Sequence, residues 1–544
     1  MTSTTAPQRN TGSPLRMIGD RISALFQRPL ANYYIILSIV GLLVLSGILM
    51  VVASSMTWSL VEGSGVWGSA VKQMVMVVIG LTSMWVMLWL PPGVVRRFSY
   101  AAMLFTILLL VLVLIPGIGT GREEVGSQSW IVVGPLRLQP SEVARVMIAV
   151  WGAHFFSRPN AKPTGPWNDY IVYSVYSGVI ACLIALEGDL GMTVTFSSVV
   201  IAMLFFAGVK KTYMFTAAAT IVIGALGMVI GTSFRNDRFT VYFDALLGHF
   251  EDTADKAYQS YQGFLSLSDG SLTGVGIGQS RAKWFYLPEA RNDFVFAVLG
   301  EEWGFVGGAI IIVLFACLLF FGMRTAAKNS NRFLALAAAT LATGVSAQAF
   351  VNIGYVIGLL PVTGIQLPMI SAGGTSAIIT LASMGLLAKG ARHEPEAISA
   401  MQSYGRPPID RLLGLKEPSL EGLSPKAPIF GNPADKSRFG ERRMPPPPPK
   451  PQKSSSTATR GSKRESFHRS SYVVGDQRNT RGNQGLEWRE NRARNTDPRY
   501  FSGTAEFGNR WASESNKYGA GSVGDRKRDR WSSQNSKDDR RRRR

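Results

Sequence analysis

Long apolar runs separated by short polar connections dominate residues 31–392. A helix needs about 20 apolar residues to cross the roughly 30 Å hydrocarbon core of a membrane. Runs such as Met103–Ile115, whose only polar side chain is Thr106, are typical of such spans. The pattern therefore predicts an all-α polytopic membrane protein with ten transmembrane helices, at about 33–53, 68–90, 98–116, 141–157, 170–186, 190–209, 212–232, 293–323, 333–359 and 368–389.

Basic residues mark every second connection between these segments. They precede the first segment and follow the second, fourth, sixth, eighth and tenth. Because cytoplasmic loops are enriched in Lys and Arg, both termini are expected in the cytoplasm. The first apolar run has the length of a full span and no convincing cleavage site after it, so we expect an uncleaved anchor. The extracellular connections are then about 54–67, 117–140, 187–189, 233–292 and 360–367.

The net charge of +21 has two separate sources. Residues 1–392 carry 25 basic and 18 acidic side chains, whereas residues 393–544 carry 32 and 18. The second region loses hydrophobic periodicity and is rich in Pro, Ser, Arg, Gly and Asn, a composition that predicts disorder. We therefore expect a cytoplasmic N-terminal segment (1–30), a membrane domain (31–392) and a disordered, basic cytoplasmic tail (393–544).

The tail has few aromatic residues and no accompanying fold, so nucleic-acid binding is not expected. Two interpretations of its charge stay open. It could be attracted to anionic lipid at the membrane surface, or it could dock an acidic cytoplasmic partner. In the membrane domain, the sequence contains no Walker, Rossmann or zinc-hydrolase signature, which excludes ATP-driven chemistry of those types. The two cysteines lie in separate spans and are expected to be small buried hydrophobes.

The longest extracellular connection, 233–292, is far longer than a turn requires, and such loops are usually functional. Pro288 suits the first turn of a helix, so we expect a helix there that places Glu289, Asp293 and Glu301 near one face. An acidic residue in an apolar span costs about 2.5–3.5 kcal/mol on insertion scales, and it is therefore usually functional or paired. Neighbouring carboxylates raise each other's pKa, which suits general-base catalysis.

A second extracellular group of residues surrounds the start of the fourth span. Ile131–Leu138 is predicted to be a short strand or an extended interfacial segment, with Trp130 as its anchor. Glu142 and Arg145 are spaced for a helical pair. That pair could join helices by neutralising charge, or it could serve a site.

Three further polar side chains inside the spans have the same two interpretations. Lys72 could extend to the headgroups or contact a substrate. Gln348 and Asn352 lie one turn apart and could hydrogen-bond between helices or line a site.

Four ordered motifs resemble those of the SEDS family of bacterial cell-wall polymerases, over about residues 33–390. They read GSQSWIVVGPLRLQPSE (126–142), EGDLGMT (187–193), GVGIGQSRAKWFYLPEARNDFVFAVLGEEWG (274–304) and QAFVNIGYVIGLLPVTGIQLPMISAGGTS (348–376). The ISAGGTS motif, with Ala372, and the long tail are similar to the FtsW-type cell-division branch. The RodA-like elongation branch more often has an aromatic residue at that position.

The resemblance implies a peptidoglycan glycosyltransferase that polymerises lipid II, with a lipid-linked glycan strand as donor. Asp293 matches the family's essential acid. It would take the proton from the GlcNAc 4-hydroxyl that attacks the donor MurNAc, which releases undecaprenyl pyrophosphate with inversion to a β-1,4 linkage. The further candidates for substrate binding are Glu142, Arg145, Lys72, Arg137, Arg281, Lys283, Glu289, Gln348 and Asn352, with the five cations as candidates for phosphate contact. A divalent cation, Mg or Mn, is implied at the pyrophosphate, but the sequence shows no metal ligand set.

The resemblance also implies partners and a location. The expected partners are a class B penicillin-binding protein transpeptidase, other divisome proteins and, through the tail, an FtsZ-like cytoplasmic partner. The expected location is the bacterial plasma membrane at the division septum, with the active site on the outer face. A lipid II flippase or transporter is an alternative from another class, and a scaffold role could coexist with catalysis.

The chain departs from the family's common motifs at three places. Ser129 precedes Trp130, where the family often has Arg. Glu187-Gly188-Asp189 stands where the family often has Gln-Pro-Asp. Arg291-Asn292 precedes Asp293, where His-Thr is common; the acid itself is retained.

Overall fold

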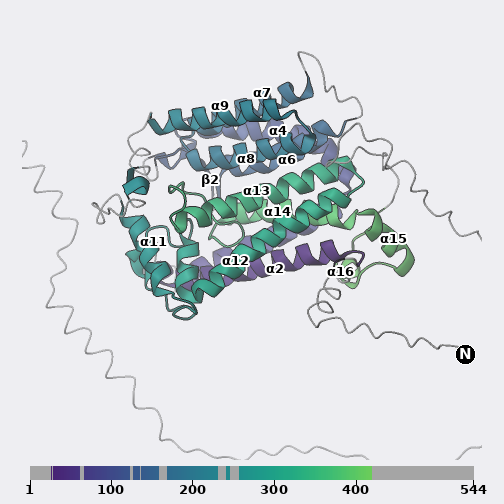
Figure 1. The fold of residues 1–544 in the computed structure, drawn as a ribbon. Helices are drawn as coiled ribbons and strands as arrows, with labels where there is room; N and C mark the ends of the chain where they lie inside the picture. Colours follow the sequence, from purple (N-terminus) through teal and green to yellow (C-terminus); the bar gives the residue numbers. More distant parts are fainter. Residues whose placement is uncertain are drawn as a thin grey trace, which may run out of the picture. The chain divides into compact units, whose positions relative to one another are not determined.

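The computed structural model describes residues 26, 28–61, 67–122, 126–134, 136–158, 168–230, 240–244 and 257–418. These residues form a helical bundle with a small sheet at one end (Figure 1). The elements are α2 (Ala31–Val61), α3 (Gly68–Trp89), α4 (Pro92–Leu114), β1 (Gly119–Thr120), β2 (Trp130–Val133), β3 (Leu136–Leu138), α6 (Pro140–Phe156), α7 (Asp169–Leu186), α8 (Leu190–Ala207), α9 (Lys211–Ile230), α11 (Tyr258–Asp269), the π-helix η1 (Ala282–Tyr286), α12 (Val295–Lys328), α13 (Arg332–Val356), α14 (Gly374–Arg392), α15 (Pro395–Tyr404) and α16 (Pro408–Leu412).

Each of the ten predicted spans coincides with a long helix in the described part of the chain. Seven of these helices are long and apolar enough to cross a membrane, namely α2, α3, α4, α7, α8, α12 and α13. The other three helices, α6, α9 and α14, are not among these seven. The total of ten spans therefore stays a prediction.

Apolar side chains cover both the interior and the outer faces of the bundle. α8 and α13 are largely buried, whereas α3, α4 and α7 present large apolar residues outward, among them Leu104 and Phe105. A helix that is apolar all round requires an apolar surrounding on its outer side. The protein is therefore a multi-pass membrane protein. Cys182 also lies on an outer face, so the expectation that both cysteines are buried was wrong.

Small residues allow α3 and α14 to approach closely. A Cβ on Gly80 of α3 would meet Leu381, and a Cβ on Gly385 of α14 would meet the backbone of Met84. Close approach at small residues is a common way of packing helices in membranes.

The large connection before α12 is fastened to a break in that helix. Gly304 has φ 69° and ψ −170°, which interrupts α12 nine residues after its start. On one side of the break, Phe305 N donates to Ser271 O at 2.9 Å, and on the other Val275 N donates to Glu301 O at 2.9 Å. The loop backbone thus replaces helical hydrogen bonds that the break removes. The eighth predicted span is therefore a helix in two parts.

The sheet forms on the side of the bundle where α11 also lies (Figure 1). β1, β2 and β3 are antiparallel neighbours in that order, with Ile131 opposite Leu138. The predicted extended segment is thus a hairpin, and Trp130 begins its first strand.

Helical structure continues past the predicted boundary at residue 392. α15 and α16 lie at the end of the bundle away from β2 and α11 (Figure 1). Asp410 is fully buried and forms a 2.7 Å ion pair with Arg392, and it also accepts a hydrogen bond from the Tyr33 hydroxyl at 2.9 Å. Placing the start of the disordered tail at His393 was therefore wrong, because residues 393–418 pack against the membrane domain. The rest of the predicted tail, and most of the segment 1–30, lie outside the described residues.

Candidate active site

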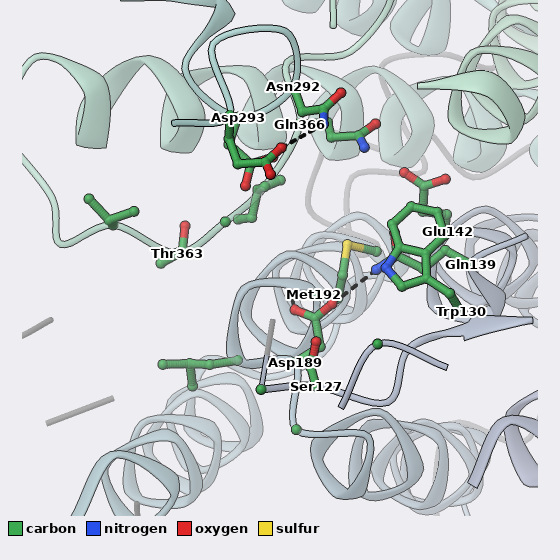
Figure 2. Close-up of a pocket in the computed structure, with 18 of the residues that line it drawn as sticks. Ser127, Trp130, Gln139, Glu142, Asp189, Met192, Asn292, Asp293, Thr363 and Gln366 are labelled. Carbon is green, nitrogen blue, oxygen red and sulfur yellow. Dashed lines mark hydrogen bonds between the residues drawn. The ribbon is translucent and has the colours of Figure 1, made fainter. Parts of the chain in front are cut away.

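A cavity of about 400 Å³ opens where four of the five predicted extracellular connections meet. It is lined from the sheet and the start of α6, the turn between α7 and α8, the segment before α12, and the connection from α13 to α14. Five of the predicted site residues line it: Arg137, Glu142, Glu289, Asp293 and Gln348. Figure 2 shows Asn292, Asp293 and Gln366 on one side, across from Glu142, Gln139 and Trp130.

The backbone at Asp293 is held in place by two side chains of α13. Asn352 Nδ2 donates to Asp293 O at 2.8 Å, and the Tyr355 hydroxyl donates to the same oxygen at 2.9 Å. Asn352 Nδ2 also donates to Ile365 O at 2.6 Å, and the Tyr355 hydroxyl oxygen lies 2.6 Å from the same atom, so its one proton is shared between Asp293 O and Ile365 O. Ser371 Oγ donates to Asn292 O at 2.6 Å. α13 and the connection before α14 therefore fix the position from which the Asp293 carboxylate extends into the cavity. Asn352 is buried and acts through this backbone, not as a residue of the cavity lining.

Asp293 does not lie on a helix, which corrects the expectation based on Pro288. Residues 287–294 form turns, and α12 begins only at Val295. Glu289 has φ 54°, a left-handed conformation that costs a non-glycine residue about 1–2 kcal/mol and ends any helix started by Pro288. Glu289 Oε2 accepts from Asn292 Nδ2 at 2.7 Å, which holds this turn at the cavity. Glu289 and Asp293 reach the cavity from this turn instead of from one helix face.

Glu301 has a different role from the two acids that precede it. Its carboxylate accepts hydrogen bonds from Ser280 Oγ at 2.7 Å and from Arg281 N at 2.6 Å. The side chain is buried, outside the cavity lining, at the start of η1. Glu301 therefore fastens the large loop to the first part of α12.

The opposite wall is organised by Asp189. Its Oδ1 accepts from Met192 N at 2.8 Å and so caps the start of α8. Its Oδ2 accepts from Gln139 Nε2 at 2.9 Å (Figure 2). Trp130 lies beside them, half-buried, and gives this polar wall an aromatic face. An aromatic face with a few placed polar groups is typical of small-molecule binding sites.

Glu142 and Arg145 lie at the base of this wall. Both are buried, at 2% and 3% exposure. Glu142 Oε2 and Arg145 Nε and Nη1 have no hydrogen-bond partner among the described residues. The expected Glu142–Arg145 pair therefore interacts through charge. These atoms make no direct hydrogen bond to each other. Only Glu142 reaches the cavity lining.

The other four predicted cations, besides Arg145, differ in their exposure and in their distance from the cavity. Arg137 is exposed and lines the cavity, and its strand is tied to α14 because Thr375 Oγ1 donates to Arg137 O at 2.7 Å. Lys72 is exposed on α3, outside the lining. Lys283 is buried and donates to Gly278 O within the large loop. Arg281 is exposed beside it. The structure thus places Arg137 alone of these four at the cavity.

A buried carboxyl group lies directly behind Asp189. Glu187 is 2% exposed, and neither of its carboxyl oxygens has a hydrogen-bond partner among the described residues. Burial, together with the nearby Asp189 charge, raises the pKa of Glu187 to about 9. Glu187 is therefore protonated, and neutral, at neutral pH.

The described residues contain no group of three His, Cys, Asp or Glu side chains that could hold a metal ion. The divalent cation at the pyrophosphate therefore stays an expectation from the resemblance, and the chemistry below is assigned to side chains.

Sequence reasoning missed several residues of the cavity. Trp130 was expected to be only an anchor, and Gln139, Asp189, Thr363 and Gln366 were not singled out. Asp189 carried a usable signal, because an Asp immediately before an apolar run is typical of a helix N-cap. Thr363 and Gln366 carried none, since only the folded connection brings them to Asp293.

Known proteins are similar to this chain in sequence and in fold. The sequence model of the FtsW/RodA/SpoVE family, described as cell cycle protein, matches residues 33–396. The probable peptidoglycan glycosyltransferase FtsW of Mycobacterium tuberculosis is 38% identical over 399 residues, which cover 73% of this chain and 75% of that protein. Stage V sporulation protein E of Bacillus subtilis is 34% identical over 365 residues, which cover 66% of this chain and 97% of that protein.

A solved structure has the same fold. It comes from work on the structural coordination of polymerization and crosslinking by a peptidoglycan synthase complex, and it matches with a TM-score of 0.52 at 25% identity. The match covers 66% of this chain and 97% of the solved one. With the family match over most of the membrane domain, these findings show that the chain belongs to the FtsW/RodA/SpoVE family of cell cycle proteins.

Proposed function

We propose that this protein is a peptidoglycan glycosyltransferase that polymerises lipid II into β-1,4 glycan strands during septal cell-wall synthesis. The observation that carries the proposal is the position of Asp293. It lies in a cavity formed by four of the connections that the sequence predicts to be extracellular, and its backbone is fixed by Asn352 and Tyr355. The names of the relatives support the class of reaction.

In the proposed reaction, Asp293 is the general base. Its carboxylate takes the proton from the 4-hydroxyl of the acceptor GlcNAc as that oxygen attacks the anomeric carbon of the donor MurNAc. The new C–O bond forms as the bond from the anomeric carbon to the phosphate oxygen breaks, and undecaprenyl pyrophosphate leaves with its electron pair. Attack opposite the leaving group gives inversion. Asp293 then returns its proton to water. A base is needed only at the attacking hydroxyl, because the pyrophosphate leaves as an anion without taking up a proton, so one well-positioned carboxylate suffices.

Charge in the cavity supports two separate subsites. Asp293 and Glu289 are acidic, whereas Arg137 provides a cation on the other side, at the rim formed by β3. A guanidinium group binds phosphate oxygens well. We assign the pyrophosphate to the Arg137 side and the attacking sugar to the Asp293 side.

We also propose the setting of this activity. The relative in a peptidoglycan synthase complex supports a class B penicillin-binding protein as partner. The cavity faces the extracellular side if the charge pattern of the connections sets the orientation. The similarity to FtsW proteins supports a location at the division septum.

The test is glycan synthesis from labelled lipid II by the purified full chain, with and without a class B transpeptidase. Wild type is expected to make long glycan strands, and Asp293→Ala to lose at least about 100-fold in rate, the usual contribution of a general base. The matched control is Asp269→Ala, at an exposed acid of α11 outside the cavity, which should polymerise normally. Full polymerisation by a folded Asp293→Ala protein would contradict the assignment. Translocation of lipid II in liposomes without polymerisation would favour a flippase.

A further inference from the structure

One wall of the cavity carries three oxygen atoms that lack hydrogen-bond partners. They are Gln348 Oε1, Thr363 Oγ1 and Gln366 Oε1, and each is shielded from solvent and unpaired within the described residues. All three side chains line the cavity. Buried polar groups in proteins are normally hydrogen-bonded, and each one left unpaired costs free energy. Three such atoms on one wall of a cavity indicate that a ligand supplies the partners.

The orientation of Gln348 follows from its neighbour. Gln348 Nε2 donates to Gln366 O at 2.9 Å. A backbone carbonyl can only accept, so the amide nitrogen must face it and the Oε1 atom must be the unpaired end. Gln348 therefore presents an acceptor, from a side chain that is 1% exposed.

The space that the Gln366 amide occupies depends on a glycine. A Cβ at Gly373 would lie closer to Gln366 Oε1 than any real Cβ contact allows. Gly373 has φ −109°, a conformation open to any residue, so its backbone does not require glycine. The glycine instead leaves space for the Gln366 amide, which Figure 2 shows beside Asn292 and Asp293.

The chemistry of these atoms selects a class of ligand. The two glutamine oxygens only accept hydrogen bonds, and the Thr363 hydroxyl can donate or accept. None of the three carries charge, so they do not match a pyrophosphate. They match a neutral group rich in donors that also has one acceptor. An N-acetylhexosamine has such a set in its hydroxyl groups, its acetamido N–H and its acetamido carbonyl.

We propose that Gln348, Thr363 and Gln366 bind the acceptor sugar and set the specificity of the site for an N-acetylhexosamine. The glutamine Oε1 atoms accept from hydroxyl or acetamido N–H groups, and the Thr363 hydroxyl donates to the acetamido carbonyl. The assignment to the acceptor rests on the proposed function, because Gln366 lies on the same side of the cavity as Asp293, which deprotonates that sugar.

The experiment separates acceptor binding from donor binding. A lipid II analogue with a methylene group in place of the anomeric oxygen cannot lose pyrophosphate, so it can accept a glycan but cannot donate one. The full chain, with its transpeptidase partner, receives unlabelled lipid II at fixed concentration and the labelled analogue at varied concentration. Incorporation of label gives KM and kcat for the acceptor.

The variants are Gln366→Met, Gln348→Met and Thr363→Val, which keep the shape of each side chain and remove its polar end. The matched control is Gln128→Met. Gln128 is a buried glutamine that is hydrogen-bonded to Val113 O and lies outside the cavity lining. The melting temperature in detergent identifies any variant that fails to fold. The cavity variants that do fold then test the proposal.

Each folded cavity variant should raise the acceptor KM by about three- to tenfold, the usual effect of one lost neutral hydrogen bond, with kcat changed less than about twofold. Gln128→Met should change neither. An acceptor KM within twofold of wild type in all folded cavity variants would overturn the inference, as would a fall in kcat alone. Failure of the proposed function is a different result, because wild type itself would then make no glycan and incorporate no label.

Discussion

The neutral state of Glu187 makes a specific prediction about stability. The substitution Glu187→Gln replaces a buried carboxyl group with an amide of nearly the same shape. The pKa of Glu187 is about 9 in the folded protein, against 4.5 for an ordinary glutamate. Between these values the folded protein holds the proton and the unfolded chain has released it. Raising the pH therefore lowers the free energy of unfolding of wild type. The variant has no titrating group at this position, so its stability lacks this dependence on pH.

The magnitude follows from the width of this pH range. Each pH unit between the two pKa values changes the free energy of unfolding by about 1.4 kcal/mol. From pH 5 to pH 8, the stability of wild type relative to the variant should fall by up to about 4 kcal/mol.

The assay is thermal unfolding of both proteins in detergent at pH 5, 6.5 and 8. The variant should melt close to wild type at pH 5 and well above it at pH 8. Glu187→Leu serves as a control, because leucine cannot titrate either. Its melting temperature relative to wild type should change with pH in the same way, whatever its absolute stability. The reasoning would be refuted if the difference in melting temperature between Glu187→Gln and wild type were constant with pH, or if wild type were the more stable protein at pH 8.

Two further predictions concern how the ends of the bundle are held. A chain that stops after Pro418 should melt like the full chain and polymerise in vitro. One that stops after Arg392 should lose about 3–5 kcal/mol of stability, because it loses the buried ion pair of Arg392 with Asp410 and the hydrogen bond from Tyr33 to Asp410. Equal melting temperatures of the two truncated proteins would contradict this. Glu301→Gln should weaken the bonds to Ser280 and the start of η1 and cost about 1–3 kcal/mol. Limited proteolysis should then cut the large loop faster than in wild type, and unchanged cleavage would count against the role of Glu301.

Much of the fold was predictable because it depends on properties of single segments of the chain. The length of an apolar run decides whether a helix can cross a membrane, so the ten segments in the sequence all coincide with helices. The alternation of basic connections correctly grouped the loops that meet at the cavity. Asp293 was found through a motif, which is local as well.

Other features depend on contacts between distant residues, and the sequence pattern does not contain them. Pro288 suits a helix start, but Glu289 adopts a left-handed conformation and α12 begins at Val295. The composition after residue 392 resembles a disordered tail, yet Asp410 is buried against Tyr33, on a helix from the other end of the chain.

The sequence by itself determined which segments become helices, which connections meet at one cavity and which acid is the best candidate base. Only the tertiary structure decided which side chains face that acid. Lys283 and Asn352 donate hydrogen bonds to backbone carbonyl groups, whereas Gln366 lines the cavity. The physical reason is that hydropathy acts along a single helix, whereas a cavity is formed by side chains from several connections, whose meeting depends on how the helices pack.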